Sequence, residues 1–170
     1  RKRMEETLRS SERQLRGILD NMQDVYYRTD DEGRFIKVSP AIKDMLGYAP
    51  EEVLGRRVAE FYWNPEDEKG FREMMKKNGG RIREHEVKFR RRDGRQIWLW
   101  TNGQYLHDAS GVVIGIEGTS RDITDRKDAE EELRKAHDEL EIRVQERTRE
   151  LEEALEQVGE VSRAKSDFLA

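Results

Sequence analysis

The sequence predicts an α+β fold: one antiparallel sheet of five strands with short helices on one face, flanked by an N-terminal amphipathic helix and a long C-terminal coiled-coil helix. The order of the patterns points to this fold, because two short strands precede several short helices and three longer strands. Composition agrees, since 41% of the 170 residues are charged and 34% hydrophobic, which suits a globular unit of about 100 residues joined to solvated helices. We therefore expect three segments, residues 1–22, 23–123 and 124–170.

The first segment has the pattern of an amphipathic helix. Its apolar residues recur at helical spacing and line one face: Met4, Leu8, Leu15, Ile18, Leu19 and Met22. Two interpretations stay open. The helix either lies on its own domain or pairs with its copy in a dimer.

The middle segment opens with a predicted hairpin and three short helices. Strands at residues 25–30 and 34–38 surround a glycine-containing loop, a typical hairpin signal. Proline near the start and glycine or asparagine at the end delimit the helices that follow. These helices begin at Ser39-Pro40, at Pro50 and at Asn64-Pro65, and the last extends to Lys77.

Three longer strands complete the middle segment. We place them at residues 83–92, 95–107 and 112–121, with turns at Asp93-Gly94 and at residues 108–111. His85 shares strand parity with Val87 and Phe89, so its side chain is expected on the core side. No metal site is expected from the histidines, and His137 is expected to be solvated on the C-terminal helix.

The third segment is predicted to be one helix with a coiled-coil seam. The seam is formed by Leu133, Leu140, Val144, Leu151, Val158 and Val161. From Val144 onward the seam positions alternate between steps of three and four residues, and Arg147 and Lys165 are its charged members. Before that point, Ala136, Leu140 and Val144 follow at two successive steps of four, which is a stutter in the repeat. A helix this polar cannot bury its apolar face on its own, so a partner is implied, and we expect a parallel homodimer.

Several classes of function are disfavoured. The net charge of −4 lacks the basic excess of a nucleic-acid binder, and no cysteine is present for disulfides, thiolate metal sites or nucleophilic catalysis. Apolar runs are too short for membrane insertion, and no catalytic motif for nucleotides, esters or peptides is found. A chain that begins at Arg1 and stops at Ala170 without a helix stop signal is expected to be a non-catalytic fragment of a longer protein.

A set of short motifs follows in one order along the middle segment: Asp30-Asp31-Glu32-Gly33, Ser39-Pro40-Ala41, residues 50–55, Asn64-Pro65-Glu66-Asp67, Arg92-Asp93-Gly94 and residues 121–127. In this order and spacing they resemble a PAS domain of the subtype that is followed by a PAC-type motif. The resemblance covers about residues 15–133. It implies a sensory or dimerisation module whose sheet and helices enclose a pocket.

The resemblance also implies what that pocket could hold. Flavin photosensors of the family need a reactive cysteine, and haem members take a histidine from the helix placed at residues 65–77. This sequence offers neither, so a small organic ligand or an empty packed core remains. The expected lining residues, which are also core candidates, are Phe61, Phe71, Met75, Val87, Phe89 and Leu99.

The C-terminal helix resembles the signalling helix that links sensors to kinase domains. Glu146-Arg147-Thr148 matches the short signature of such linkers, and residues 163–170 are similar to the start of the phosphotransfer helix of a sensor histidine kinase. The expected function is therefore a cytoplasmic sensor and dimerisation module of a two-component kinase, with a kinase domain and a response regulator as partners. A ligand-free structural spacer, or input to a nucleotide cyclase, are the alternatives.

The strand-to-helix junction at Asp122, Ile123 and Thr124 is expected to transmit the signal. Thr124 or Asp125 is predicted to cap the first helical turn. By resemblance, Asp122 is expected to pair with Arg92 or Arg95 of the preceding hairpin.

Trp98 is the remaining candidate for signal transmission, and Trp100 lies on the same strand. The two tryptophans alternate with Ile97 and Leu99, so one pair faces the pocket and the other faces outward. We expect the helix at residues 4–22, from the same chain or from a partner, to cover the tryptophans.

Overall fold

A computed structural model describes residues 2–170, so Arg1 of the expected first segment lies outside the described residues. The described chain forms two compact units that divide between Asp125 and Arg126. The first unit contains helix α1 (Lys2–Asn21) and the sheet with its short helices, and the second is the greater part of helix α5 (Thr124–Leu169). The α+β prediction is confirmed.

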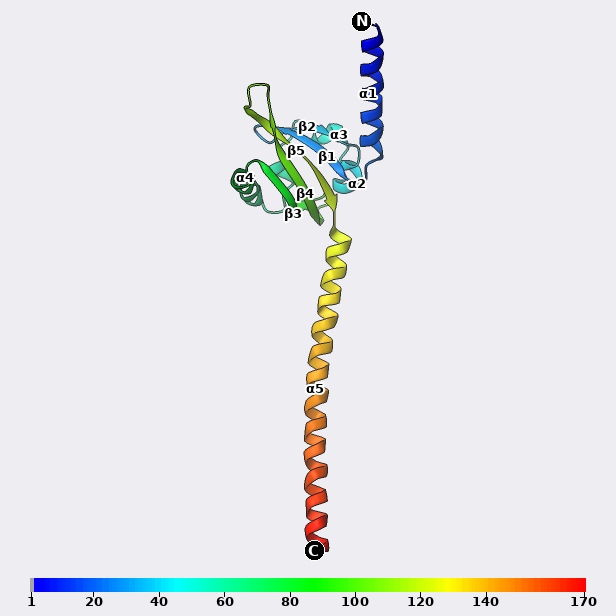
Figure 1. Cartoon of the computed structure of the whole chain (residues 1–170), viewed down its shortest axis with the longest axis vertical. Helices are drawn as coiled ribbons and strands as arrows, with labels where there is room; N and C mark the ends of the chain where they lie inside the picture. The colour runs from blue at the N-terminus through cyan, green and yellow to red at the C-terminus, as the bar shows by residue number, and fades with distance from the viewer. Residues whose placement is uncertain (1) are drawn as a thin grey trace. The chain divides into compact units, whose positions relative to one another are not determined.

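The sheet of the first unit has five antiparallel strands (Figure 1): β1 (Val25–Asp30), β2 (Phe35–Val38), β3 (Arg81–Arg90), β4 (Gln96–His107) and β5 (Val113–Asp122). Their order across the sheet is β2-β1-β5-β4-β3. The last strand in sequence is therefore inserted between β1 and β4, and the chain leaves the sheet from its central strand.

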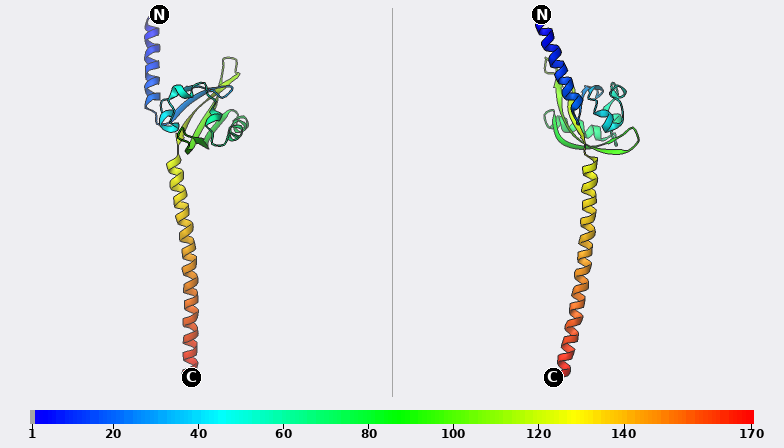
Figure 2. Two further views of the ribbon diagram at one scale, coloured as in Figure 1. Left: turned by 180° about the vertical axis from the view of Figure 1, so that it is seen from behind. Right: turned by 90° about the vertical axis from the view of Figure 1, so that its right-hand side faces the viewer.

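The short helices lie on one face of the sheet, as Figure 2 shows from two sides. They are α2 (Ile42–Leu46), α3 (Pro50–Val53), the 3-10 helix η1 (Val58–Phe61) and α4 (Asp67–Lys77). Gly47 ends α2 with a φ of 81°, the left-handed conformation that favours glycine at this position. The sequence prediction omitted η1, because one 3-10 turn is too short to show a periodic pattern.

Burial follows the alternation of the strands. Val87 and Phe89 on β3 and Ile97 and Leu99 on β4 turn inward and pack against the helices, together with Phe61. Phe71 and Met75 of α4 form a second cluster with Ile82. One irregularity interrupts β3 between Ile82 and His85, where Glu84 has a φ of 55°. After this bulge His85 pairs with Thr101 of β4.

Helix α5 extends unbroken over 46 residues, and none of its side chains is buried in the single chain. All six predicted seam residues are exposed, from 56% for Leu140 and Val144 to 73% for Leu133. The prediction of one long helix is confirmed. Its apolar residues have no cover within the described chain.

Candidate functional site

A small apolar cavity lies between the sheet and the helices of the first unit. It is lined by Phe71, Val87, Phe89 and Leu99, four of the six predicted pocket residues, and by residues of β1, α2 and β5. The other two predicted residues are core residues: Phe61 is 1% exposed beside the rings of Phe35 and Tyr48, and Met75 is fully buried.

The volume of the cavity is about 50 Å³. One water needs at least about 10–15 Å³ of such space, so the cavity holds a few waters or a group of a few atoms. Pockets for drug-sized ligands occupy roughly 300–1,000 Å³. Larger ligands would therefore require the helices to move away from the sheet.

Hydroxyl groups form one polar part of the cavity wall. The Ser120 hydroxyl donates to Thr101 Oγ1 at 2.9 Å, and Thr101 Oγ1 donates to the carbonyl of Thr119 at 3.1 Å. The Tyr27 hydroxyl lies 3.4 Å from Thr101 Oγ1, and burial raises the pKa of this tyrosine. The sequence analysis missed this cluster, although Thr101 shares strand parity with Leu99.

An ion pair borders the same cavity. Arg72 of α4 contacts Glu68 at 2.9 Å and donates a long hydrogen bond to the carbonyl of Asp31 at 3.5 Å. A Cβ on Gly33 would come within 2.5 Å of Arg72 Nη2, and the φ of Gly33 is 77°. Glycine at this position lets the arginine side chain lie across the β1–β2 turn.

The junction between sheet and helix is fixed to β4 by backbone hydrogen bonds. Ile123 is buried, and its N–H donates to the Trp98 carbonyl at 2.9 Å. The Trp98 N–H donates to Thr124 Oγ1 at 3.0 Å. Asp122 Oδ1 accepts from both the N–H and the hydroxyl of Thr124, at 2.8 and 2.6 Å. The first residue of α5 is thus bonded to both β4 and β5.

One prediction about this junction is wrong. Arg92 bonds to Glu52 at 2.8 Å and Arg95 pairs with Asp93 at 2.7 Å, so neither is the expected partner of Asp122. The strand register gives the reason: Asp122 lies opposite Leu99, four residues, or about 13 Å, along the strand from Arg95. Asp122 accepts the N–H of Thr124, the first residue of the helix, and the cap expected from Thr124 or Asp125 stays a prediction.

The outer face of the sheet carries Trp98 and Trp100, both half-buried, while Ile97 and Leu99 turn inward as the alternation predicts. Lys88 Nζ lies 4.6 Å from the ring centre of Trp98. The apolar side chains Met4, Leu8, Leu15 and Ile18 of α1 are 54–78% exposed. The expectation that α1 covers the tryptophans within one chain is therefore wrong for this structure, and cover by a partner chain stays a prediction.

Glu117 on the same outer face accepts hydrogen bonds from three side chains: Gln104 Nε2 at 2.9 Å, Arg28 Nη2 at 2.9 Å and the Tyr26 hydroxyl at 3.0 Å. The Gln104 bond, followed by those from Arg28 and Tyr26, lowers the pKa of Glu117. The sequence pattern does not indicate this cluster. Its members come from β1, β4 and β5, and only the register brings them together.

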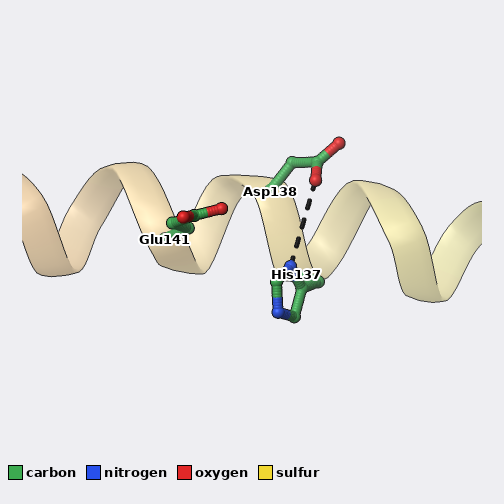
Figure 3. Close-up of side chains that lie close together, drawn as sticks. All are labelled: His137, Asp138 and Glu141. Carbon is green, nitrogen blue, oxygen red and sulfur yellow. Dashed lines mark ion pairs between the residues drawn. The ribbon is translucent and has the colours of Figure 1, made fainter.

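The histidines occupy different environments. His85 is half-buried, its ring centre lies 5.7 Å from that of Phe71, and burial lowers its pKa. His137 on α5 is exposed, as expected, and forms one group with Asp138 and Glu141 (Figure 3). The ligand atoms of these three side chains all lie within 4.8 Å of one another, with His137 Nδ1 4.0 Å from Asp138 Oδ1.

Comparison with known proteins gives one family match, the PAS domain, over residues 23–125. The methanogenesis regulatory histidine kinase FilI of Methanothrix harundinacea is 31% identical over 75% of this chain and 14% of its own length. The C4-dicarboxylate transport sensor protein DctS of Rhodobacter capsulatus is 32% identical over 82% of this chain and 22% of its own length.

A solved PAS domain of a protein from Colwellia psychrerythraea has a similar fold, with a TM-score of 0.60 at 23% identity, covering 66% of this chain and 97% of that one. The chain thus spans less than a quarter of the two sensor proteins above. Across residues 2–170, no helix combines the length and apolar character that crossing a membrane requires.

Proposed function

The chain belongs to the PAS domain family, and from this premise we propose that it is the sensory and dimerisation module of a two-component sensor histidine kinase. Its three parts are an N-terminal helix (residues 1–22), a PAS sensor (23–123) and a signalling coiled coil (124–170) that leads to the kinase domain. The proposed location is the cytoplasm. The proposed partners are a second copy of the chain, the kinase domain and its response regulator.

One observation carries this proposal: β5, one of the strands that line the cavity, continues directly into helix α5. Ser120 contributes to the cavity wall, and Asp122, two residues on, bonds to Thr124 at the start of α5. On the neighbouring strand, Leu99 lines the cavity and the adjacent Trp98 bonds to Ile123 and Thr124. A change in cavity volume would therefore displace strands that hold the first turn of the helix.

The proposed input is a small organic ligand. A cysteine-linked flavin requires a thiol that the sequence does not contain, and α4 carries no histidine for haem. The apolar wall and the Tyr27, Thr101 and Ser120 hydroxyls fit a compact molecule with one polar group. The small volume favours a second candidate function, a spacer whose core is simply packed. Native mass spectrometry separates the two, because a retained small molecule contradicts the spacer.

The coupling can be tested in the full-length protein without a known ligand. Ser120→Val fills part of the cavity, and we expect it to change the rate of autophosphorylation. In the Asp122→Ala background the same substitution should have no effect, whereas Asp125→Ala should leave its effect intact. An equal response to Ser120→Val with and without Asp122 would contradict the coupling.

The exposed apolar residues of α5 support the proposed parallel dimer, since Leu140, Leu151 and Val158 would each meet their own copy. The sequence has no cysteine, so single substitutions report cleanly on distance. We expect Val158→Cys to form an intermolecular disulfide rapidly and Glu156→Cys, which points away from the seam, slowly. Equal rates, or a monomeric mass in solution, would contradict the dimer.

A further inference from the structure

The coiled-coil repeat of α5 continues without a stutter if it passes through His137 instead of Ala136. Leu133, His137, Leu140 and Val144 follow at steps of four, three and four residues. The same alternation then runs on to the end of the helix through Arg147, Leu151, Ala154, Val158, Val161, Lys165 and Phe168. An unbroken alternation of this kind defines one face of a two-stranded coil. In a parallel dimer, His137 then lies on the side of the helix that faces the dimer axis, opposite His137 of the second copy.

The same helical turn supplies carboxylates that can accompany the imidazole. Glu141 lies four residues after His137, the spacing at which two helical side chains are neighbours. The ligand atoms of His137, Asp138 and Glu141 lie within 4.8 Å of one another. Figure 3 shows the three side chains on successive turns of the helix. Asp138 already bonds to Arg134 Nη1 at 3.0 Å. His137 and Glu141 are therefore the better pair of ligands.

We propose that His137 and Glu141 from both chains of the parallel dimer form a four-ligand site for a transition-metal ion such as Zn²⁺. The inference rests on the proposed dimer, because one chain supplies only half of the set. Imidazole nitrogen and carboxylate oxygen are ligands that Zn²⁺ accepts, and four of them satisfy its tetrahedral geometry. Bundles of helices build metal sites in the same way, from inward side chains on facing helices.

The site would fasten the coil close to the sensor. His137 lies 13 residues after Thr124, or about 20 Å along the helix. Arg147 and Lys165 place charges in the seam farther on and weaken it there. A metal ion at His137 would stabilise the dimeric helix where its seam begins, so metal supply would act on the same element as the signal from the PAS domain.

Zinc titration of the whole 170-residue chain, stripped with EDTA, tests the site. We expect one Zn²⁺ per two chains by calorimetry and an increase in the thermal midpoint of α5, followed by circular dichroism. His137→Ala should abolish binding and Glu141→Gln should weaken it at least tenfold. His107→Ala, at an exposed histidine of the sheet, is the matched control and should bind as the parent does.

The seam position is tested separately by disulfide formation in metal-free protein. His137→Cys should cross-link at least tenfold faster than Ala136→Cys, and the reverse order would overturn the placement of His137. Binding of one Zn²⁺ per chain, or uptake unchanged by His137→Ala, would overturn the site. A dimer in EDTA that takes up no zinc overturns only this inference. A monomer both with and without zinc overturns the proposed dimer as well.

Discussion

The two units differ in whether their leucines are buried within the single chain. Leu99 in the sheet is 1% exposed, whereas Leu151 on α5 is 61% exposed. The sheet of the first unit and the short helices on it bury a common apolar core, so the stability of this part is a property of one chain. The second leaves its apolar residues exposed, and in the proposed dimer its stability would depend on protein concentration. Under that proposal, one sequence contains a part that folds by itself and a part that is completed by assembly.

The largest expected effect separates these two kinds of leucine. Leu99→Ala removes a buried side chain and should lower the free energy of unfolding of the PAS unit by about 2–5 kcal/mol. Leu151→Ala should leave that unfolding transition within about 0.5 kcal/mol of the parent and weaken dimerisation instead. Urea denaturation and sedimentation measure the two quantities. A loss of PAS stability in Leu151→Ala would contradict the inference that the two units are stabilised independently.

A smaller effect is expected where the two units join. Thr124→Val removes the hydroxyl that donates to Asp122 and accepts from the Trp98 N–H. We expect a loss of about 1–2 kcal/mol in the stability of the PAS unit, since two hydrogen bonds disappear at a partly buried position. Thr148→Val is the matched control, because its hydroxyl bonds only within α5, to the Val144 carbonyl. Equal losses in both variants would argue against a special role of the junction.

Helix α1 belongs to the first unit, but it exposes an apolar face, as α5 in the second unit does. If α1 of a partner chain covers Trp98 and Trp100, deleting residues 1–20 should shift tryptophan emission to longer wavelength. It should also weaken dimerisation about 5- to 10-fold, or about 1 kcal/mol. Leu15→Ser with Ile18→Ser should reproduce the effect, and Glu6→Ser on the polar face should not. Unchanged tryptophan emission and an unchanged dimerisation constant after the deletion would exclude this cover.

The smallest effect concerns pH and the first unit alone. Burial lowers the pKa of His85 in the folded chain, so the unfolded chain binds this proton at a higher pH. Stability should therefore fall modestly as the pH drops below the ordinary histidine value of about 6.5. His85→Gln should flatten this decline between pH 7 and pH 5, measured by denaturation at each pH. His107→Gln should retain it.

The order of the elements was predictable because proline, glycine and strand alternation mark each one. Gly47 ends α2 and Asp93-Gly94 joins β3 to β4, as local chemistry requires. Contacts set by strand register were not predictable. Asp122 lies opposite Leu99 and away from Arg95 only because of the β4–β5 pairing. The inward hydroxyl of Ser120 and the outward Glu117 cluster depend on the same register.

The place of β5 in the sheet has a consequence for synthesis of the protein on the ribosome. β5 pairs with both β1 and β4, and contacts such as Tyr26 with Glu117 join residues 91 positions apart. Until residues 113–122 have emerged, β1–β2 and β3–β4 are two separate hairpins, each with an unpaired edge. The next residues to emerge are those of α5. All five strands have therefore emerged before α5, so the sheet can be completed before the helix is made.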